Sequence, residues 1–299
     1  MDNKDISKNS LKAWVLASRP KTLTGASVPV MIGLSLAWTA VGAEDFKLLP
    51  AVLCVLFAFI MQIDANFVND YFDFVSGKDD EQRLGPARAC AMGWIEIGKM
   101  RWGIILTTAL ACMVGLPLVL YGGMEMILVG ALCVVFCFLY TTLLASHGLG
   151  DLLVLVFFGI VPVCAMYYLQ TATCTWIVFL ASLACGLVID TLLVVNNYRD
   201  IDNDRRAGKK TLIVMIGADK GRLLYLWLGI IASLMGVVFA VYGQYWTPLL
   251  PTVYLIMHIA TYRRMVKIGS GRQLNLVLAD TARNMFVYGL TLSLGLLLS

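Results

Sequence analysis

The sequence predicts an all-α protein that crosses a membrane many times, with about nine transmembrane helices in a single bundle. The first observation behind this prediction is the composition: 60% of the residues are hydrophobic, 14% are charged, and the mean hydropathy is +0.80. A soluble domain carries roughly 25% charged residues, so the chain belongs to the polytopic membrane class. The second is that apolar residues form separate stretches of membrane-spanning length, and the third is that positive charges fall in alternate connections.

The apolar stretches define the predicted helices in order. Nine can be placed, at residues 23–41, 48–74, 102–121, 126–144, 151–169, 175–198, 223–242, 246–262 and 281–298. A transmembrane helix needs about 20 mostly apolar residues, and these stretches are near that length. The last two are the least regular, because Pro248 and Pro251 interrupt the eighth and the ninth is short. We expect residues 1–299 to form one integral-membrane domain.

The positive charges test this count independently, because cytoplasmic loops are enriched in Lys and Arg. Five such residues precede the first stretch, five lie between the second and third, seven between the sixth and seventh, four between the eighth and ninth, and one, Arg283, near the start of the ninth. These are 22 of the 23, and the exception is Lys47. Nine helices with a cytoplasmic N-terminus place every basic segment on one side. We therefore expect a multi-pass protein of a bacterial-type inner (plasma) membrane, with its chemistry on the cytoplasmic side and its first helix retained rather than cleaved as a signal peptide.

One polar string occurs twice, each time at the end of an apolar stretch. Residues 69–73 read Asn-Asp-Tyr-Phe-Asp, and residues 196–200 read Asn-Asn-Tyr-Arg-Asp, 127 positions later (196 minus 69). Each string ends the second helix of its half, so we expect pseudo-repeats at about 11–144 and 149–262, with an extra helix at 281–298. Carboxylates gathered at a membrane surface are costly unless a cation lies between them, so the duplication indicates a functional site.

The helical spacing of these strings predicts two stripes of oxygen ligands. The stripes are Asn66, Asp70 and Asp73 in the first half, and Asn197, Asp200 and Asp204 in the second. Members of each stripe are three or four residues apart and so share one helix face. Oxygen ligands without His or Cys favour Mg²⁺, which typically joins carboxylates to phosphate oxygens. The alternative is that they are polar residues at helix ends in contact with water, but two face-matched copies favour the metal site.

A basic segment follows each string. Lys78, Arg83 and Arg88 come after the first, and Arg205, Arg206, Lys209 and Lys210 come after the second. Such side chains neutralise phosphate oxygens, and we expect this role for Arg83, Arg88 and Lys209. Alone, these charges would only mark the cytoplasmic side of the membrane. Their position directly behind the acidic strings favours a bound diphosphate.

These residues resemble the UbiA-type intramembrane prenyltransferases, and among them the 1,4-dihydroxy-2-naphthoate polyprenyltransferases of menaquinone synthesis. Asn69, Asp70 and Asp73 in the first half are similar to the first acidic motif of the family. Asp200 and Asp204 in the second half are similar to its second acidic motif. Where the superfamily often has a further Asp, this chain has Gly77 followed by Asp79, a form similar to the naphthoate subgroup. Shorter matches occur at residues 19–23, 83–88, 148–151, 196–202, 208–212 and 281–283.

The resemblance implies an enzyme that moves a polyprenyl chain from its diphosphate to an aromatic acceptor, with loss of CO₂ to give demethylmenaquinone. It implies Mg²⁺ as the cofactor. The implied Mg²⁺ ligands are Asp70, Asp73, Asp79, Asp200 and Asp204. Of these, Asp70, Asp73, Asp200 and Asp204 are also implied to be catalytic. Substrate contacts are implied for Asn66, Asn69, Arg83, Arg88, Asn197, Lys209 and Asp151. The partners are then the two substrates and the lipid bilayer, with no nucleic acid and no obligate protein partner.

Two alternatives stay open at this stage. A transporter would also use intramembrane carboxylates, although it predicts them near the midplane of the membrane rather than at helix ends. A prenyltransferase with another acceptor, such as 4-hydroxybenzoate or a haem, would share the acidic strings. Release of CO₂ from the acceptor separates the naphthoate from the hydroxybenzoate.

Three acidic residues inside or at the ends of apolar stretches allow two interpretations each. Asp64 lies about 180° around its helix from Asp73, so it is either a buried structural group or a functional one. Asp190 lies on the face of Asn197, about two turns deeper, where it could touch the acceptor or a water molecule. Asp151 either stabilises a helix N-terminus or belongs to the acceptor site.

Overall fold

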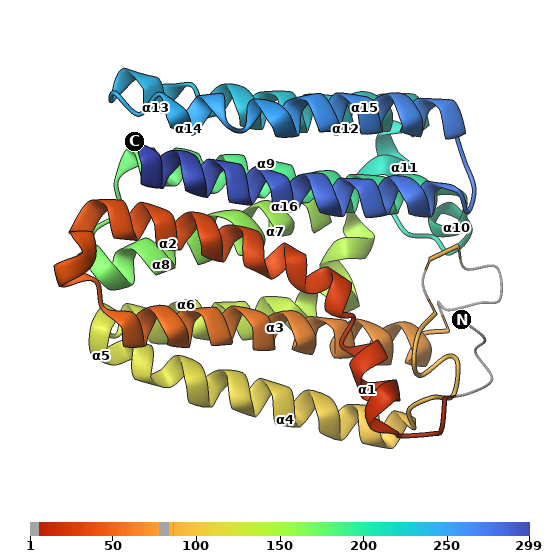
Figure 1. The fold of residues 1–299 in the computed structure, drawn as a ribbon. Helices are drawn as coiled ribbons and strands as arrows, with labels where there is room; N and C mark the ends of the chain where they lie inside the picture. The colour runs from red at the N-terminus through yellow and green to blue at the C-terminus, as the bar shows by residue number, and fades with distance from the viewer. Residues whose placement is uncertain (1–5, 78–83, 86) are drawn as a thin grey trace.

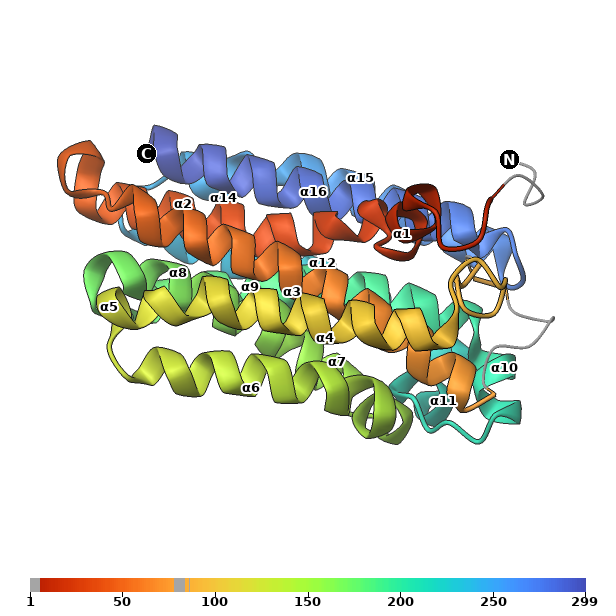
Figure 2. The same ribbon diagram turned by 90° about the horizontal axis from the view of Figure 1, so that it is seen from below.

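The chain folds into a bundle of antiparallel helices (Figures 1 and 2). The computed structural model describes residues 6–77, 84–85 and 87–299, and no strand occurs among them. The first half comprises α1 (Leu11–Ala17), η2 (Pro20–Thr22), α2 (Leu23–Asp45), α3 (Leu48–Val75), α4 (Ile97–Gly115), η3 (Leu116–Leu118), α5 (Val119–Gly122), α6 (Glu125–Leu139), η4 (Tyr140–Leu144) and η5 (Ala145–His147). The rest comprises α7 (Gly150–Val154), η6 (Leu155–Ile160), α8 (Val161–Thr171), α9 (Trp176–Arg199), α10 (Ile201–Arg206), α11 (Leu212–Ile216), α12 (Ala218–Met235), α13 (Val238–Val241), α14 (Trp246–Leu249), α15 (Thr252–Ile268) and α16 (Leu274–Leu298).

Seven helical segments in the described part of the chain are long and apolar enough to cross a membrane. They are Leu23–Asp45, Leu48–Val75, Ile97–Gly122, Glu125–His147, Gly150–Thr171, Trp176–Arg199 and Ala218–Val241. They coincide with the first seven predicted stretches, so the prediction of an all-α, multi-pass membrane protein is confirmed.

The last two predicted spans correspond to α14–α15 and to α16. Helix α15 has 17 residues and ends on a basic stretch, while α16 carries Asp280 and Arg283 in its first half. Both run alongside the other long helices (Figure 1). Helix α15 is shorter than the seven clear spans and α16 is not among them, so the count of nine stays a prediction.

The two ends of the bundle differ in what they carry. Helices α1, α10 and α11 lie at one end, which we call the polar end, and the last turn of α16 lies at the opposite one (Figure 1). Helices α3 and α9 both run toward the polar end and finish there, so both copies of the repeated string come to the same end of the bundle (Figure 2).

Helix α9 occupies the interior of the bundle. In the most apolar 18-residue stretch of α9, 61% is buried inside the protein. The corresponding share for the segment that contains α6 is 6%. Small residues allow neighbouring backbones to approach, as is common between membrane helices. At the crossing of η6 and α9, a Cβ added to Gly159 would lie 2.6 Å from the Cα of Gly186. This close packing fixes how α7 and η6 lie against α9.

Two short π-helical segments interrupt the helices near the polar end. They are η4 in the continuation of α6 and η6 between α7 and α8. A π-helical turn widens the helix and is frequent at functional sites. Both segments flank the turn that precedes Gly150, which brings that turn into the region where α3 and α9 end.

Candidate active site

Asp70 folds the segment that follows α3 back over the helix end. Its side chain is 1% exposed, and its two oxygens accept hydrogen bonds from backbone amides. The amide of Cys90 donates to Oδ1 at 2.9 Å, and the amide of Ala89 donates to Oδ2 at 2.8 Å. Hydrogen bonds to a carboxylate are among the stronger ones in proteins. The first predicted metal ligand is therefore also the anchor of the returning loop.

The same loop brings a cation to the next carboxylate of the stripe. Arg88, which is 7% exposed, pairs its Nη2 with Oδ2 of Asp73 at 2.5 Å. The sequence predicts a phosphate contact for Arg88 and a metal contact for Asp73, and the fold places the two side chains in direct contact. A positive and a negative group suited to a metal–phosphate substrate thus lie together at the end of α3.

In the second string, Asp200 forms a two-pronged ion pair with its neighbour. Arg199 donates from Nε to Oδ1 at 2.9 Å and from Nη2 to Oδ2 at 2.6 Å, the fork geometry that guanidinium groups favour with carboxylates. The Arg199 side chain is 1% exposed. Sequence reasoning did not select Arg199 as a site residue. The signal available was a basic residue at the variable position of an otherwise acidic string.

Asp204 lies one helical turn beyond Asp200 and pairs with a predicted phosphate ligand. Nζ of Lys209 is 3.2 Å from Oδ1 of Asp204. Burial raises the pKa of Asp204 above its ordinary value, although the charges of Lys209 and Arg199 act to lower it. By contrast, the side chain of Asp202 is 80% exposed. Asp204 also interacts electrostatically with Asp200, at the junction of α9 and α10, whereas Asp202 points to solvent; the metal stripe itself stays a prediction.

A single side chain joins the two halves of the site. Asn275, in the first turn of α16, accepts from Nη1 of Arg199 at 2.8 Å and donates from Nδ2 to the carbonyl oxygen of Leu84 at 2.9 Å. Leu84 belongs to the segment that follows the first string, and Arg199 to the second string. The start of α16 thus holds the two motifs in register, a role that the sequence did not reveal.

We expect Asn275→Ala to raise the KM for a prenyl diphosphate about 5- to 30-fold, because two hydrogen bonds worth roughly 1–2 kcal/mol together are lost. Arg199 keeps its bonds to Asp200 and to Asn196, so the fold is retained. Steady-state kinetics in membranes measures the effect. Gln273→Ala is the control, since Gln273 is exposed on the same helix end. An unchanged KM for Asn275→Ala would show that the link does not support the site.

Asn66 acts on the N-terminal turn. Its Nδ2 donates to the carbonyl oxygen of Ser18 and to Oγ1 of Thr22, both at 2.9 Å. Between these two residues, Arg19 has a φ of 49°, in the left-handed region that non-glycine residues seldom adopt. Asn66 therefore clamps an unusual turn against α3, while its predicted contact with substrate stays a prediction.

The remaining predicted residues differ in how the structure places them. Oδ1 of Asn69 accepts from Oγ1 of Thr141 at 2.6 Å, which ties α3 to the π-helical segment η4. Asn197 is 9% exposed at the end of α9. Asp151 has both carboxylate oxygens buried without a hydrogen-bond partner. Asp79 and Arg83 fall outside the described residues, so their predicted roles are neither supported nor opposed.

The donor set fits a hard divalent cation that is brought in with its substrate. Within the described ranges, no group of three His, Cys, Asp or Glu side chains forms a ready-made metal cage. The four carboxylates offer oxygen only, the ligand that Mg²⁺ prefers, and Mg²⁺ commonly uses one or two carboxylates together with substrate phosphates. Because Asp204 is buried near Asp200, a bound cation would also relieve the cost of holding its negative charge.

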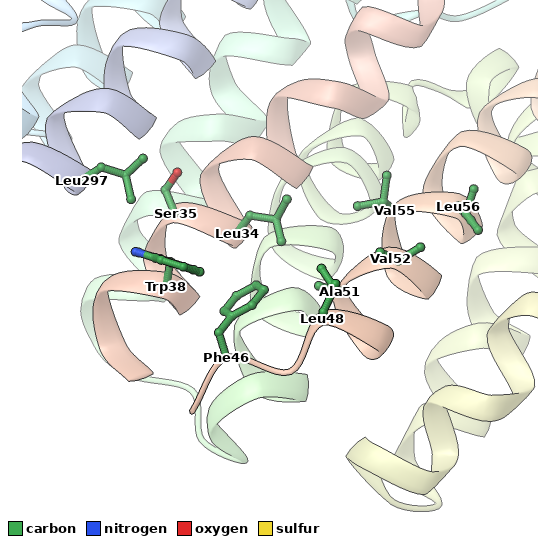
Figure 3. Close-up of a pocket in the computed structure, with 10 residues that line it drawn as sticks. All are labelled: Leu34, Ser35, Trp38, Phe46, Leu48, Ala51, Val52, Val55, Leu56 and Leu297. Atoms are coloured by element: carbon green, nitrogen blue, oxygen red, sulfur yellow. The ribbon is translucent and has the colours of Figure 1, made fainter. Parts of the chain in front are cut away.

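A separate apolar groove lies beside the first turns of α3, whereas the first acidic string lies in its last turns (Figure 3). It has a volume of about 470 Å³. Its walls come from α2, α3, the connection between them and the end of α16: Leu34, Ser35, Trp38, Phe46, Leu48, Ala51, Val52, Val55, Leu56 and Leu297. These residues include no charged side chain, so the groove suits hydrocarbon and not the chemistry of the acidic strings.

The sequence and the fold of this chain resemble those of known proteins. The profile of the UbiA prenyltransferase family matches residues 26–290. The 1,4-dihydroxy-2-naphthoate octaprenyltransferase of Haemophilus influenzae is 36% identical over 250 residues, which are 81% of this chain and 81% of the relative. The enzyme of the same name from Mycobacterium tuberculosis is 33% identical over 287 residues, covering 95% of this chain and 96% of the relative.

A solved structure agrees with the architecture. The UbiA homolog from Archaeoglobus fulgidus bound to DMAPP and Mg²⁺ matches with a TM-score of 0.64 and 15% identity, over 94% of this chain and 99% of that one. At that identity the match shows the fold alone. The family profile, by contrast, spans most of the sequence and agrees with the doubled acidic motif on α3 and α9. The chain therefore belongs to the UbiA prenyltransferase family.

Proposed function

We propose that this protein transfers a polyprenyl chain from its diphosphate to 1,4-dihydroxy-2-naphthoate in a Mg²⁺-dependent reaction, with loss of CO₂ to give demethylmenaquinone in its reduced, hydroquinone form. The acceptor is supported by the similarity to naphthoate octaprenyltransferases at 33–37% identity over most of the chain. The observation that carries the chemistry is the doubled motif: Asp70 binds a pair of backbone amides, and Asp73, Asp200 and Asp204 each pair with a basic side chain.

Asp70 and Asp73 on one side, and Asp200 and Asp204 on the other, would hold Mg²⁺ with the diphosphate between them. Asp79 is proposed as a further ligand from the sequence alone. When bound, the metal supplies Lewis-acid stabilisation of the negative charge that develops on the diphosphate. Homologues in this family have been solved with DMAPP or GPP and Mg²⁺, which supports a divalent metal here.

The basic side chains have a second use once the substrate binds. Arg88, Arg199 and Lys209 balance the acidic residues in the structure described here. A diphosphate entering the same space offers them new oxygens, and their charges then oppose the cost of breaking the allylic C–O bond. Arg83 is proposed for the same role from its place in the sequence.

The membrane provides the setting for both the substrate and the reaction. A polyprenyl tail gains about 0.8 kcal/mol for each CH₂ buried in lipid, so the reaction has to take place where the tail lies. An allylic cation also requires a site that excludes water. We place the polar end on the cytoplasmic side and the N-terminus inside, in accordance with the distribution of Lys and Arg in the sequence.

The proposal predicts that membranes containing the protein convert carboxyl-labelled 1,4-dihydroxy-2-naphthoate and a polyprenyl diphosphate to prenylated product, with one labelled CO₂ released for each product. Activity should vanish when EDTA removes divalent metal and return with Mg²⁺. Mass spectrometry of the product and counting of the trapped CO₂ measure the two yields.

The alternatives give different results in the same assay. Prenylation of 4-hydroxybenzoate without any naphthoate product would show that the acceptor is wrong and the prenyl transfer right. Naphthoate product formed with the label retained would contradict the decarboxylation. Failure to consume prenyl diphosphate with any acceptor, in folded protein with Mg²⁺, would contradict the reaction itself.

A further inference from the structure

Two carboxylates with buried oxygens interact at a place apart from the acidic strings. Asp190 on α9 is 5% exposed, and its Oδ1 has no hydrogen-bond partner. Asp151, at the start of α7, has both oxygens buried, and no other residue donates a hydrogen bond to them. The two side chains interact electrostatically. We call Asp151 and Asp190 the acid pair.

The packing of the helices brings the pair together. The segment α7–η6 and helix α9 run in opposite directions along the bundle, and their backbones pack closely at Gly159 of η6 and Gly186 of α9, where an added Cβ would overlap backbone atoms. Gly186 precedes Asp190 by one helical turn and so shares its face. On the other segment, Gly150 is adjacent to Asp151. A Cβ added to Gly150 would lie 3.5 Å from Cδ2 of Leu193 on α9. The acid pair therefore lies at the same interface, toward the polar end.

A third buried carboxylate shows what a structural group looks like in this bundle. Asp64 on α3 is fully buried, and both of its oxygens accept hydrogen bonds. The hydroxyl of Thr107 donates at 2.5 Å and that of Thr108 at 2.9 Å. Burying polar atoms without such partners is unfavourable, and native proteins seldom do it. The unmet acceptors of the acid pair thus point to a ligand that supplies hydrogen-bond donors.

The pair lies within reach of the candidate diphosphate site. Tyr140, the first residue of the π-helical segment η4, interacts electrostatically with Asp151, with Asp190 and with Asp73. Asp73 belongs to the first acidic string, so Tyr140 joins the two regions. A molecule held by the acid pair would therefore lie on the side of the bundle where the first acidic string ends.

We propose that Asp151 and Asp190 bind a ring hydroxyl of the aromatic acceptor and take up its proton as the new C–C bond forms. This inference rests on the proposed function, because it assigns the acceptor half of that reaction. Two carboxylates in a dry site do not both ionise, so the pair holds one proton and presents one charged oxygen to the acceptor. The partner that keeps its proton orients the second oxygen.

The proton and electron balance closes within the pair. The O–H bond of the acceptor gives its proton to the charged carboxylate, and its electrons pass through the ring into the new C–C bond. The allylic C–O bond breaks, and its electron pair leaves with the diphosphate. When the ring carboxylate departs as CO₂, the electrons of that C–C bond return to the ring oxygen, which recovers the proton from the acid pair.

The test compares Asp151→Asn and Asp190→Asn with the matched control Asp64→Asn in the same membranes. Two quantities are measured: kcat/KM for 1,4-dihydroxy-2-naphthoate, and Mg²⁺-dependent binding of the prenyl diphosphate by the shift in unfolding temperature. Each variant of the pair should lose at least about 100-fold in kcat/KM, the usual contribution of a general base, and keep its binding of prenyl diphosphate. The kcat/KM of the double variant should lie within about threefold of that of the less active single variant, because the two residues act as a unit.

The outcomes separate this inference from the function on which it rests. If wild-type protein forms no prenylated naphthoate, the proposed function fails and the inference fails with it. If wild-type protein is active and both pair variants match Asp64→Asn, the inference alone is overturned. Loss of prenyl diphosphate binding in a folded Asp190→Asn variant would assign that residue to the donor site and overturn the acceptor role.

Discussion

Asp70→Asn is expected to lower prenyl transfer at least about 100-fold and to loosen the loop around Cys90. The first effect follows from removing a charge that would hold the metal–diphosphate, where electrostatic groups commonly contribute factors of 10² to 10³. The second follows from the two backbone amides that Asp70 binds, since an amide side chain can accept from only one of them. Turnover assays measure the first effect. The rate of alkylation of the buried Cys90 thiol, followed by mass spectrometry, measures the second.

Asp64→Asn is the matched control, because it is the same change on the same helix. Its threonine hydroxyls can rotate to satisfy an amide, so activity and Cys90 protection should change little. If Asp70→Asn is inactive but leaves Cys90 protected, Asp70 serves the substrate and the loop has other supports. If Cys90 becomes reactive while activity stays normal, Asp70 is an anchor and the metal assignment is wrong.

Asp200→Asn is expected to lower prenyl transfer at least about 100-fold, as for Asp70→Asn. It should also destabilise the protein by about 1–3 kcal/mol. Arg199 is 1% exposed on its side chain and would lose one prong of its ion pair. Asp202→Asn is the control, because that side chain is 80% exposed and lies outside the stripe. Prenyl transfer and thermal unfolding in detergent measure the two effects.

A double variant separates the two contributions of Asp200. Arg199→Gln combined with Asp200→Asn removes the unpaired buried charge, so we expect it to recover part of the lost stability without recovering activity. Recovery of both would show that Asp200 acts only by pairing with Arg199. Normal activity in Asp200→Asn alone would remove this residue from the metal site.

The acidic strings were predictable from the sequence because helical spacing is a local property. Asp200 and Asp204 fall on one face of a helix with 3.6 residues per turn, and Asp202 falls off it. In the structure the side chain of Asp202 is 80% exposed and that of Asp204 is 10% exposed. The internal repeat stays a prediction, since the doubled string suggests it without establishing that the two halves share a fold.

Arg199 and Asn275 could not be found in the same way. Their bond joins residues 76 positions apart, and the contact from Asn275 to Leu84 spans 191. No periodicity within a helix indicates such pairs. The same holds for Asp70, whose amide partners lie 19 and 20 residues away in a loop that no apolar pattern describes.

The sequence by itself determined that this is a multi-pass helical membrane protein with two acidic strings and the motifs of a prenyltransferase family, because apolar length, charge asymmetry and helical spacing are properties of the chain alone. Only the tertiary structure decided which buried acids have hydrogen-bond partners. The sequence left Asp64, Asp151 and Asp190 with the same two interpretations. Packing gave hydroxyl partners to Asp64 and none to the carboxylate oxygens Oδ1 and Oδ2 of Asp151 or Oδ1 of Asp190. The cost of a buried carboxylate depends on the donors around it, and those donors come from other helices.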